Sequence, residues 1–360
     1  MNLQEQDYSW IQIEGVEGIY FLEGFENSSN LYYFKEDGML IDTGNDYTAF
    51  FEFSRVGKIS EISSVFLTHS HNDHTLGLFD LLRSHEDFDG VSVFVHASMK
   101  DVLERRIRVF GKNVKVIGLK GGEEIELGDE RYRVLDTPGH TFDHICLYGS
   151  ESEILFSGDA VITHPVYDEN LGGSLKNFII TLRHLKKLNI NHIFPGHGYY
   201  ASGDVTGIIL EKSYFNAIRE LSPDRSLKEC AKAALGAGLF VEAEYSLAAH
   251  LELEDRNDRE AIFGLASIKA DRGEIEAVEE MLQNYIENSC EEALYIAGMA
   301  AMNAGKFEKA AGFFKKLVSM YGNPKYRALY GSALYECGRV AEAFEIEEFR
   351  RIYERVGQNR

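Results

Sequence analysis

The stretch SSVFLTHSHNDHTLG at residues 63–77 decides the fold of the first part of this chain. Its opening run, SSVFL, predicts a strand because it is rich in β-branched and aromatic residues. Four candidate metal ligands follow within six residues: His69, His71, Asp73 and His74. Alternation along an extended segment turns His69 and His71 to one side, and Asp73 and His74 then fall at the start of a helix. Imidazole and carboxylate ligands of this kind suit zinc, and also iron or manganese.

Three further candidate ligands stand where predicted strands end. TPGHT places His140 after the strand YRVLD, LFSGDA places Asp159 after EILF, and FPGHG places His197 after NHIF. Loops at the carboxyl ends of strands are where α/β proteins build their sites. MLIDTG likewise puts Asp42 at the end of an apolar strand, where it either supports the site or forms a turn before Gly44.

The first part of the chain alternates predicted strands with predicted helices, which indicates an α/β domain with helices covering sheets. Further strands are expected within residues 10–24, 30–44, 91–97, 132–140, 145–149 and 152–160. Helices are expected at 73–84, 98–110, 174–188 and 205–221.

The segment HSHNDH at 69–74, followed in order by His140, Asp159 and His197, resembles the metallo-β-lactamase superfamily over about residues 8–221. The HTFDHI and SGD segments are most similar to its glyoxalase II-like branch. The resemblance implies an αββα sandwich with two metals at one edge of the sheets. It also implies a ligand set: His69, His71 and His140 for the first metal, Asp73, His74 and His197 for the second, with Asp159 bridging them and Asp42 supporting the site from behind.

Hydrolysis is the chemistry that this resemblance implies. Two divalent cations, zinc foremost with iron or manganese as alternatives, would lower the pKa of a bridging water and make hydroxide available at neutral pH. Asp73 would also orient that hydroxide. The expected protein is a metal-dependent hydrolase that acts on an ester, thioester or lactone bond of a small molecule.

Two other functions stay open at this stage. Persulfide dioxygenases of the same superfamily keep these motif residues around a single iron, so a mononuclear iron dioxygenase is one alternative. Flavodiiron proteins fit less well, since they carry a glutamate where His71 stands here. The other alternative is a peptide- or protein-binding scaffold, built by the second part of the chain, which could also mediate self-association.

The second part of the chain contains an internal repeat. Four glycines recur at steps of 35, 32 and 33 residues: Gly238, Gly273, Gly305 and Gly338. A small residue precedes each by seven positions: Ala231, Ala266, Gly298 and Gly331. Another aliphatic residue follows each by five: Ala243, Val278, Ala310 and Ala343. The pattern resembles the tetratricopeptide repeat and predicts pairs of antiparallel helices over 223–360, after a catalytic domain at 1–222 that ends before Pro223.

The composition of the chain limits the classes of partner that it is expected to bind. A formal charge of −21, from 37 basic and 58 acidic residues, disfavours nucleic acid and anionic membranes. The N-terminal segment MNLQEQDYSW lacks the basic and apolar regions of a signal peptide, and no apolar run approaches the ~20 residues that span a bilayer. A cytoplasmic location is therefore expected. The four cysteines, Cys146, Cys230, Cys290 and Cys337, form no CxxC pair and are predicted to be small buried side chains.

Overall fold

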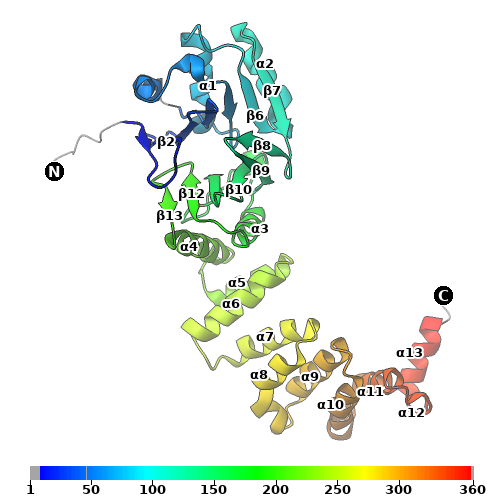
Figure 1. Ribbon diagram of the computed structural model, residues 1–360. Coiled ribbons are helices and arrows are strands. Elements are labelled where there is room, and N and C mark those ends of the chain that lie inside the picture. Colours follow the sequence, from blue (N-terminus) through cyan, green and yellow to red (C-terminus); the bar gives the residue numbers. More distant parts are fainter. Residues whose placement is uncertain (1–8, 46, 358–360) are drawn as a thin grey trace. The chain divides into compact units, whose positions relative to one another are not determined.

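The computed structural model describes residues 9–45 and 47–357 of the chain (Figure 1). The first eight residues of the expected catalytic domain and the last three of the expected repeat region lie outside the described residues. The chain divides into two compact units, one ending at Glu220 and one beginning at Leu221.

The first unit contains two β-sheets. One has the strand order β1 (Ile11–Gln12), β2 (Ile19–Leu22), β3 (Leu31–Phe34), β4 (Met39–Ile41), β5 (Ser64–Phe66), β6 (Ser92–His96) and β7 (Lys115–Leu119). The other has the order β13 (Ala201–Ser202), β12 (His192–Pro195), β11 (Ile154–Gly158), β10 (Ile145–Gly149), β9 (Glu130–Asp136) and β8 (Glu124–Leu127). Strands β4 to β7 pair in parallel, so their carboxyl ends share one edge of the first sheet.

Helices complete this unit: α1 (Asn72–Ser84), α2 (Lys100–Ile107), α3 (Leu175–Leu185) and α4 (Val205–Arg219). One apolar core lies between the two sheets, where Phe66 of β5 and Phe156 of β11 are fully buried. A second core lies between the first sheet and its helices, and it joins Val93 of β6 to Leu78 of α1 and Leu103 of α2. Helices α3 and α4 lie beside the second sheet (Figure 1). These layers confirm the predicted αββα class.

The observed elements differ from the predicted ones in detail. The strand expected over 10–24 is two strands, because a turn with Gly15 and Gly18 at positive φ separates β1 from β2. Helix α2 is shorter than the predicted 98–110, since its first and last turns are 3₁₀ helix. The sequence did not predict strands β7 and β8: β7 is a short segment, KVIGL, with a glycine inside it, and β8, EIEL, has only two apolar residues.

The second unit is helical throughout its described part. Its helices are α5 (Leu227–Gly236), α6 (Phe240–Leu253), α7 (Arg259–Asp271), α8 (Ile275–Glu287), α9 (Glu291–Asn303), α10 (Phe307–Tyr321), α11 (Pro324–Glu336), α12 (Val340–Glu345) and α13 (Glu347–Gly357). The four repeating glycines each turn the chain between two successive helices with φ between 70° and 80°. At such a φ glycine is the favoured residue, because a side chain would be strained. The tetratricopeptide assignment itself stays a prediction.

The small residues of the repeat lie where helices pack closely. All eight positions that flank the repeating glycines are buried. A Cβ added at Gly298 would lie 2.5 Å from Phe314, and one added at Gly331 would lie 2.4 Å from the Cβ of Phe349. The absence of a side chain at these two positions therefore permits the observed helix contacts.

Two further expectations from the sequence concern the burial of the cysteines and membrane-spanning helices. Cys146 and Cys230 are buried as predicted, but the prediction is wrong for Cys290 and Cys337, which are partly exposed near helix ends. Within the part of the chain that the structure describes, no helix combines the length and the apolar character needed to cross a membrane.

Replacing Gly331 with alanine should destabilise the second unit by about 1–3 kcal/mol, because the new methyl group overpacks the contact with Phe349. The matched control is Gly312→Ala in α10, where no atom lies within 4 Å of the added Cβ. This control should stabilise the helix by up to about 1 kcal/mol. Urea unfolding of the full chain, followed by far-UV circular dichroism, measures both. Equal effects of the two substitutions would contradict the packing argument.

Candidate metal centre

The HSHNDH segment follows β5 at the edge where the parallel strands end. His69 stands on the connecting loop, and His71 is the N-cap of α1 with an extended backbone. Asp73 and His74 occupy the first turn of α1. The strand and the helix together hold the four side chains in one small volume, as the sequence pattern predicted.

The remaining candidate ligands come from the second sheet. His140 lies on the loop between β9 and β10, Asp159 directly follows β11, and His197 lies two residues after β12. The structure brings these three side chains to the HSHNDH segment. The possible ligand atoms of all seven residues form three groups, and within each group all atoms lie within 4.8 Å of one another: His69, His71 and His140; His69, His74 and Asp159; Asp73, His74 and His197. That these residues bind metal stays a prediction.

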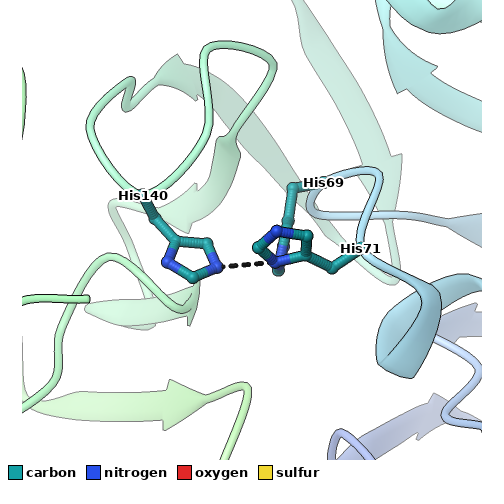
Figure 2. Close-up of side chains that lie close together, drawn as sticks. All are labelled: His69, His71 and His140. Atoms are coloured by element: carbon teal, nitrogen blue, oxygen red, sulfur yellow. Dashed lines mark hydrogen bonds between the residues drawn. The ribbon is translucent and has the colours of Figure 1, made fainter. Parts of the chain in front are cut away.

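The three histidines of the first group converge through ring nitrogens. His71 Nδ1 lies 3.0 Å from His69 Nε2 and 2.8 Å from His140 Nε2 (Figure 2). Burial and the neighbouring imidazoles lower the pKa of His69 well below its usual value. Burial also lowers the pKa of His140. Neutral imidazoles with converging lone pairs are the arrangement that a divalent cation requires.

Asp159 lies between the first group and the second. Its Oδ2 is 3.3 Å from His140 Nε2 and 3.6 Å from His197 Nε2. Its Oδ1 faces His74 Nε2 at 3.5 Å. Burial raises the pKa of Asp159, but the imidazoles around it outweigh burial and hold that pKa below its usual value. An ionised carboxylate in this position can contact both ligand groups.

Two further observations show that this donor set fits divalent metal. His74 Nε2 and Asp159 Oδ1 are buried, and neither has a hydrogen-bond partner in the described part of the chain. A Cβ at Gly196 would lie 2.2 Å from Asp159 Oδ1 and 2.7 Å from His74 Cε1, so any side chain there would enter the cluster. Buried polar atoms without partners are costly, and a cation among them would offset that cost.

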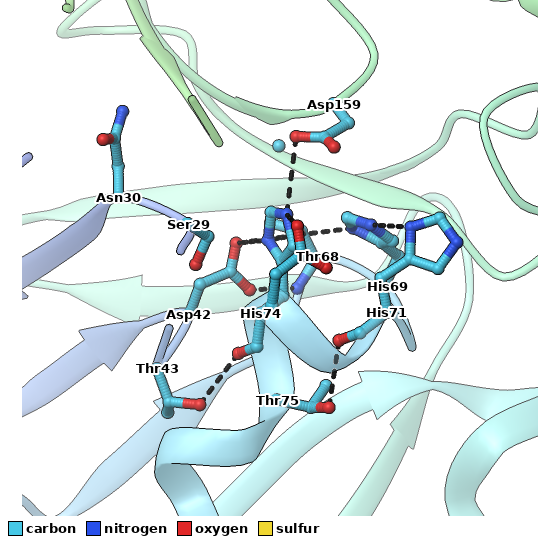
Figure 3. Close-up of polar contacts among 12 residues, drawn as sticks. Ser29, Asn30, Asp42, Thr43, Thr68, His69, His71, His74, Thr75 and Asp159 are labelled. Carbon is cyan, nitrogen blue, oxygen red and sulfur yellow. Dashed lines mark hydrogen bonds and ion pairs between the residues drawn. The ribbon is translucent and has the colours of Figure 1, made fainter. Parts of the chain in front are cut away.

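Asp42 supports the cluster from behind (Figure 3). It adopts a left-handed backbone conformation, with φ of 54°, directly after β4. Its Oδ1 accepts from the backbone N–H of Thr68 at 2.8 Å, and its Oδ2 accepts from the Thr68 hydroxyl at 2.8 Å and from His74 Nδ1 at 2.7 Å. Burial lowers the pKa of His74, but Asp42 and Asp159 outweigh burial and raise it well above its usual value. The two carboxylates therefore attract positive charge to this position, which a cation bound at His74 Nε2 would supply.

Hydrogen bonds to groups outside the cluster orient three of its imidazoles, those of His74, His69 and His140. His74 donates from Nδ1 to Asp42, and His69 donates from Nδ1 to the Thr68 hydroxyl at 3.0 Å. His140 donates from Nδ1 to the Val166 carbonyl at 2.7 Å. In each case the other ring nitrogen, Nε2, faces the cluster. This assignment of tautomers leaves the lone pairs where ligand atoms are needed.

Asp168 orients the fourth imidazole, and the sequence did not reveal it. His71 Nε2 donates to Asp168 Oδ2 at 3.4 Å, which leaves His71 Nδ1 facing the cluster. The Asp168 backbone N–H also donates to the His140 carbonyl at 2.8 Å. The stretch around His164 and Tyr167 lies between the loops that carry Asp159 and His197. The structure places this stretch against the cluster through Val166 and Asp168, while His164 and Tyr167 are exposed.

His144 packs beside the cluster. Its Nε2 accepts from the backbone N–H of Asp159 at 3.1 Å, and its Nδ1 donates to the Thr137 hydroxyl at 2.7 Å. Burial, reinforced by the neighbouring His140, lowers the pKa of His144 to about 3. The neutral ring therefore fixes the backbone that carries Asp159.

Comparisons with known proteins define the class of this domain. Residues 23–197 match the sequence profile of the family described as the metallo-beta-lactamase superfamily. That span contains all seven candidate ligands, so the first unit carries a domain of the metallo-β-lactamase type. A solved metallo-beta-lactamase family protein from Thermus thermophilus is 22% identical, with a TM-score of 0.44, over 66% of this chain and 94% of that one.

Curated relatives match the same region. An atrochrysone carboxyl ACP thioesterase of Aspergillus fumigatus is 31% identical over 163 residues, which are 44% of this chain and 34% of that protein. The beta-lactamase-like protein 2 homolog of Caenorhabditis elegans is 26% identical over 166 residues, 44% of this chain and 52% of that protein. Thioesterase pkgB of Emericella nidulans is 31% identical over 137 residues, 38% of this chain and 34% of that protein. The chain spans between about a third and a half of the length of these relatives.

Replacing Asp168 with alanine should weaken zinc binding by about 10–100-fold, because His71 loses the partner that holds its ring. Competition with a chromophoric chelator measures the affinity. Glu169→Ala is the matched control, since Glu169 is the neighbouring acidic residue and is exposed. Equal zinc affinity in the two variants would remove Asp168 from the site.

Gly196→Ala should reduce the metal content of the folded protein by more than about tenfold, because the added methyl group occupies the space between Asp159 and His74. Gly207→Ala in α4 serves as the control, since no atom lies within 4 Å of its added Cβ. Elemental analysis of the purified proteins gives the result. Full metal content in the Gly196 variant would show that the metal lies elsewhere.

Proposed function

We propose that this chain is a metal-dependent hydrolase that cleaves a thioester or ester bond of a small molecule. The observation that carries the proposal is the pair of ligand groups that meet at Asp159, each built from imidazole and carboxylate atoms. The names of relatives support the choice of bond, because two of them are thioesterases. A lactone is the closest chemical alternative, since it is a cyclic ester.

We assign the seven residues to two divalent metals, and the ligand groups of the structure support this assignment. His69, His71 and His140 would hold one, and Asp73, His74 and His197 the other, with Asp159 between them. Zinc is the first choice, and iron or manganese would suit the same ligands. When bound, such metals supply a Lewis acid and a source of hydroxide at neutral pH.

The protein's own side chains would orient the reactants. Asp73 is only half-buried, and its Oδ2 lies 3.1 Å from His197 Nε2. Burial raises the pKa of Asp73, but the hydrogen bond from His197 and the charges of His74 and His197 together outweigh burial and lower that pKa. The ionised carboxylate can therefore accept a hydrogen bond from an attacking water and fix its direction.

Exposed apolar side chains on the surrounding loops favour a substrate with an apolar body. Val166 and Tyr167 lie beside Asp168, Tyr199 follows His197 by two residues, and Phe142 follows His140 by two. Each is more than a third exposed. Exposed apolar side chains on loops that also carry site residues commonly contact a ligand.

For the second unit we propose tetratricopeptide-like repeats that bind a protein partner or a second copy of the chain. Support comes from the four glycine turns at a near-constant spacing and from the small residues that lie buried between helices. Stacked helix pairs of this kind present extended surfaces suited to binding a polypeptide.

Chelation should abolish hydrolysis, and zinc or manganese should restore it, when the chain is tested on a panel of acyl thioesters, esters and lactones. His74→Ala should lower the rate by about a hundredfold or more, because it removes a candidate ligand. His85→Ala, which lies outside the ligand groups, should keep the activity.

Measuring the metal content separates the proposed hydrolase from the alternative, a mononuclear iron dioxygenase. Two zinc or manganese ions per chain are expected. One iron per chain, with oxygen consumed in the presence of a persulfide, would instead establish a dioxygenase. No turnover by the metal-loaded chain on any member of the panel would reject the hydrolase proposal.

A further inference from the structure

Two residues directly before β3, Ser29 and Asn30 (Figure 3), connect the elements that carry the ligands assigned to the second metal. Those ligands come from α1 and from the loop after β12: Asp73, His74 and His197. The backbone N–H of Ser29 donates to the Asp73 carbonyl at 3.0 Å, and the backbone N–H of Asn30 donates to the Gly196 carbonyl at 2.7 Å. One short stretch of chain therefore joins this helix to this loop.

The side chain of Asn30 adds two further hydrogen bonds to the loop. It is 1% exposed, and its Nδ2 donates to the Pro195 carbonyl at 2.9 Å and to the Gly198 carbonyl at 2.6 Å. Its Oδ1 accepts from the backbone N–H of Gly24 at 2.9 Å, which fixes the orientation of the amide. Both amide hydrogens are therefore in use, and they bind carbonyl groups on either side of His197.

The direction of the His197 ring depends on the backbone of this loop. Its Nε2 lies 3.1 Å from Asp73 Oδ2, and Asp73 is assigned to the same metal. Among the described residues, no hydrogen bond reaches His197 Nδ1. Four other imidazoles of the cluster each have a partner outside it: His69, His71, His74 and His140. The flanking backbone, which Asn30 holds, therefore sets the direction of the His197 ring in place of such a partner.

We propose that Asn30 is a positioning residue for His197 and that the chain needs its amide to retain the second metal. Without the amide, two carbonyls of the loop lose a donor, and the loop can shift relative to α1. Ligand side chains must be held within about 0.5 Å of their productive positions, so a small shift is sufficient to weaken binding. The ligands assigned to the first metal include no residue of this loop: His69, His71 and His140. That metal should therefore stay bound.

Cobalt binding to the full chain tests the proposal without turnover, although the inference rests on the proposed function, because it assumes that His197 holds one of two metals. Co²⁺ is added to the metal-free protein against a competing chelator, and its visible absorption gives the two affinities. We expect Asn30→Ala to bind the first cobalt normally and the second at least about tenfold more weakly, because only the second metal depends on His197. Unchanged affinity for both ions, or an equal loss of both, would overturn the proposal.

Tyr32→Phe is the matched control, since it removes another buried hydrogen bond to the same loop. The Tyr32 hydroxyl donates to the Pro195 carbonyl at 2.8 Å, and its ring stacks on Phe194. Phenylalanine keeps the stacking, and the Asn30 amide still binds the loop. We expect the affinity for the second cobalt to stay within about threefold of the unaltered value. A loss as large as that in Asn30→Ala would contradict a specific role of Asn30.

Asn30→Asp separates the donors of the amide from its volume. Aspartate has nearly the same size and keeps an acceptor for the Gly24 N–H, but a carboxylate cannot donate to the two loop carbonyls. We expect this variant to lose the second cobalt as Asn30→Ala does. Normal binding of both ions by Asn30→Asp would show that the donors are not needed and would overturn the proposal.

Amide hydrogen exchange gives a readout that needs no metal. In the metal-free chain, the amides of residues 196–200 should exchange at least about tenfold faster in Asn30→Ala than in the unaltered protein, because the loop opens more often. The amides of residues 72–77, in α1, should keep their rates. Mass spectrometry of peptic fragments measures both segments. Unchanged exchange at residues 196–200 would overturn the proposal whatever the metal content.

Turnover then separates this inference from the function on which it rests. We expect Asn30→Ala to lower kcat more than it changes KM, because Asn30 acts through a ligand and not through the substrate. Two cobalt ions per unaltered chain, without hydrolysis of any ester, thioester or lactone, would reject the proposed function and keep the role of Asn30. Hydrolysis by a chain that binds a single cobalt would keep the proposed function and overturn the inference.

Discussion

The hydrogen bonds of Asp42 hold the first unit's site together. This carboxylate, at the end of β4, accepts from Thr68 on the loop after β5 and from His74 in α1, so one side chain joins a strand, a loop and a helix. The left-handed backbone of Asp42 carries a strain that few non-glycine residues tolerate. Three charge-assisted hydrogen bonds offset that strain and fix the direction in which His74 Nε2 faces.

Hydrogen bonds to groups outside the cluster also orient three of its other histidine side chains. Four imidazoles each donate one ring N–H to an acceptor outside the cluster and turn the other nitrogen inward. The acceptors differ in kind: two carboxylates, one hydroxyl and one backbone carbonyl. Rigid orientation of ligand side chains before a metal arrives lowers the entropy lost on binding, which is why such outer contacts contribute to affinity.

The two units are stabilised in different ways. In the first, both sheets must assemble before Asp159 and His197 can meet the HSHNDH segment, since His197 and Asp73 are 124 residues apart in sequence. In the second, successive helices pack against sequence neighbours, and glycine turns with small contact residues recur along the chain. A site that needs distant segments therefore sits in the part of the chain with long-range contacts.

The sequence by itself determined the αββα class and singled out seven side chains that the structure gathers, because a strand, a turn and a helix start are local and leave a readable pattern. It also placed Asp42 and the repeating glycines, since each stands at the end of an element. The contact of Asp168 with the cluster depended on tertiary structure. Asp168 meets His71 across 97 residues of sequence. A contact over that distance cannot be read from residue type or spacing, so only the packing of the two sheets decided it.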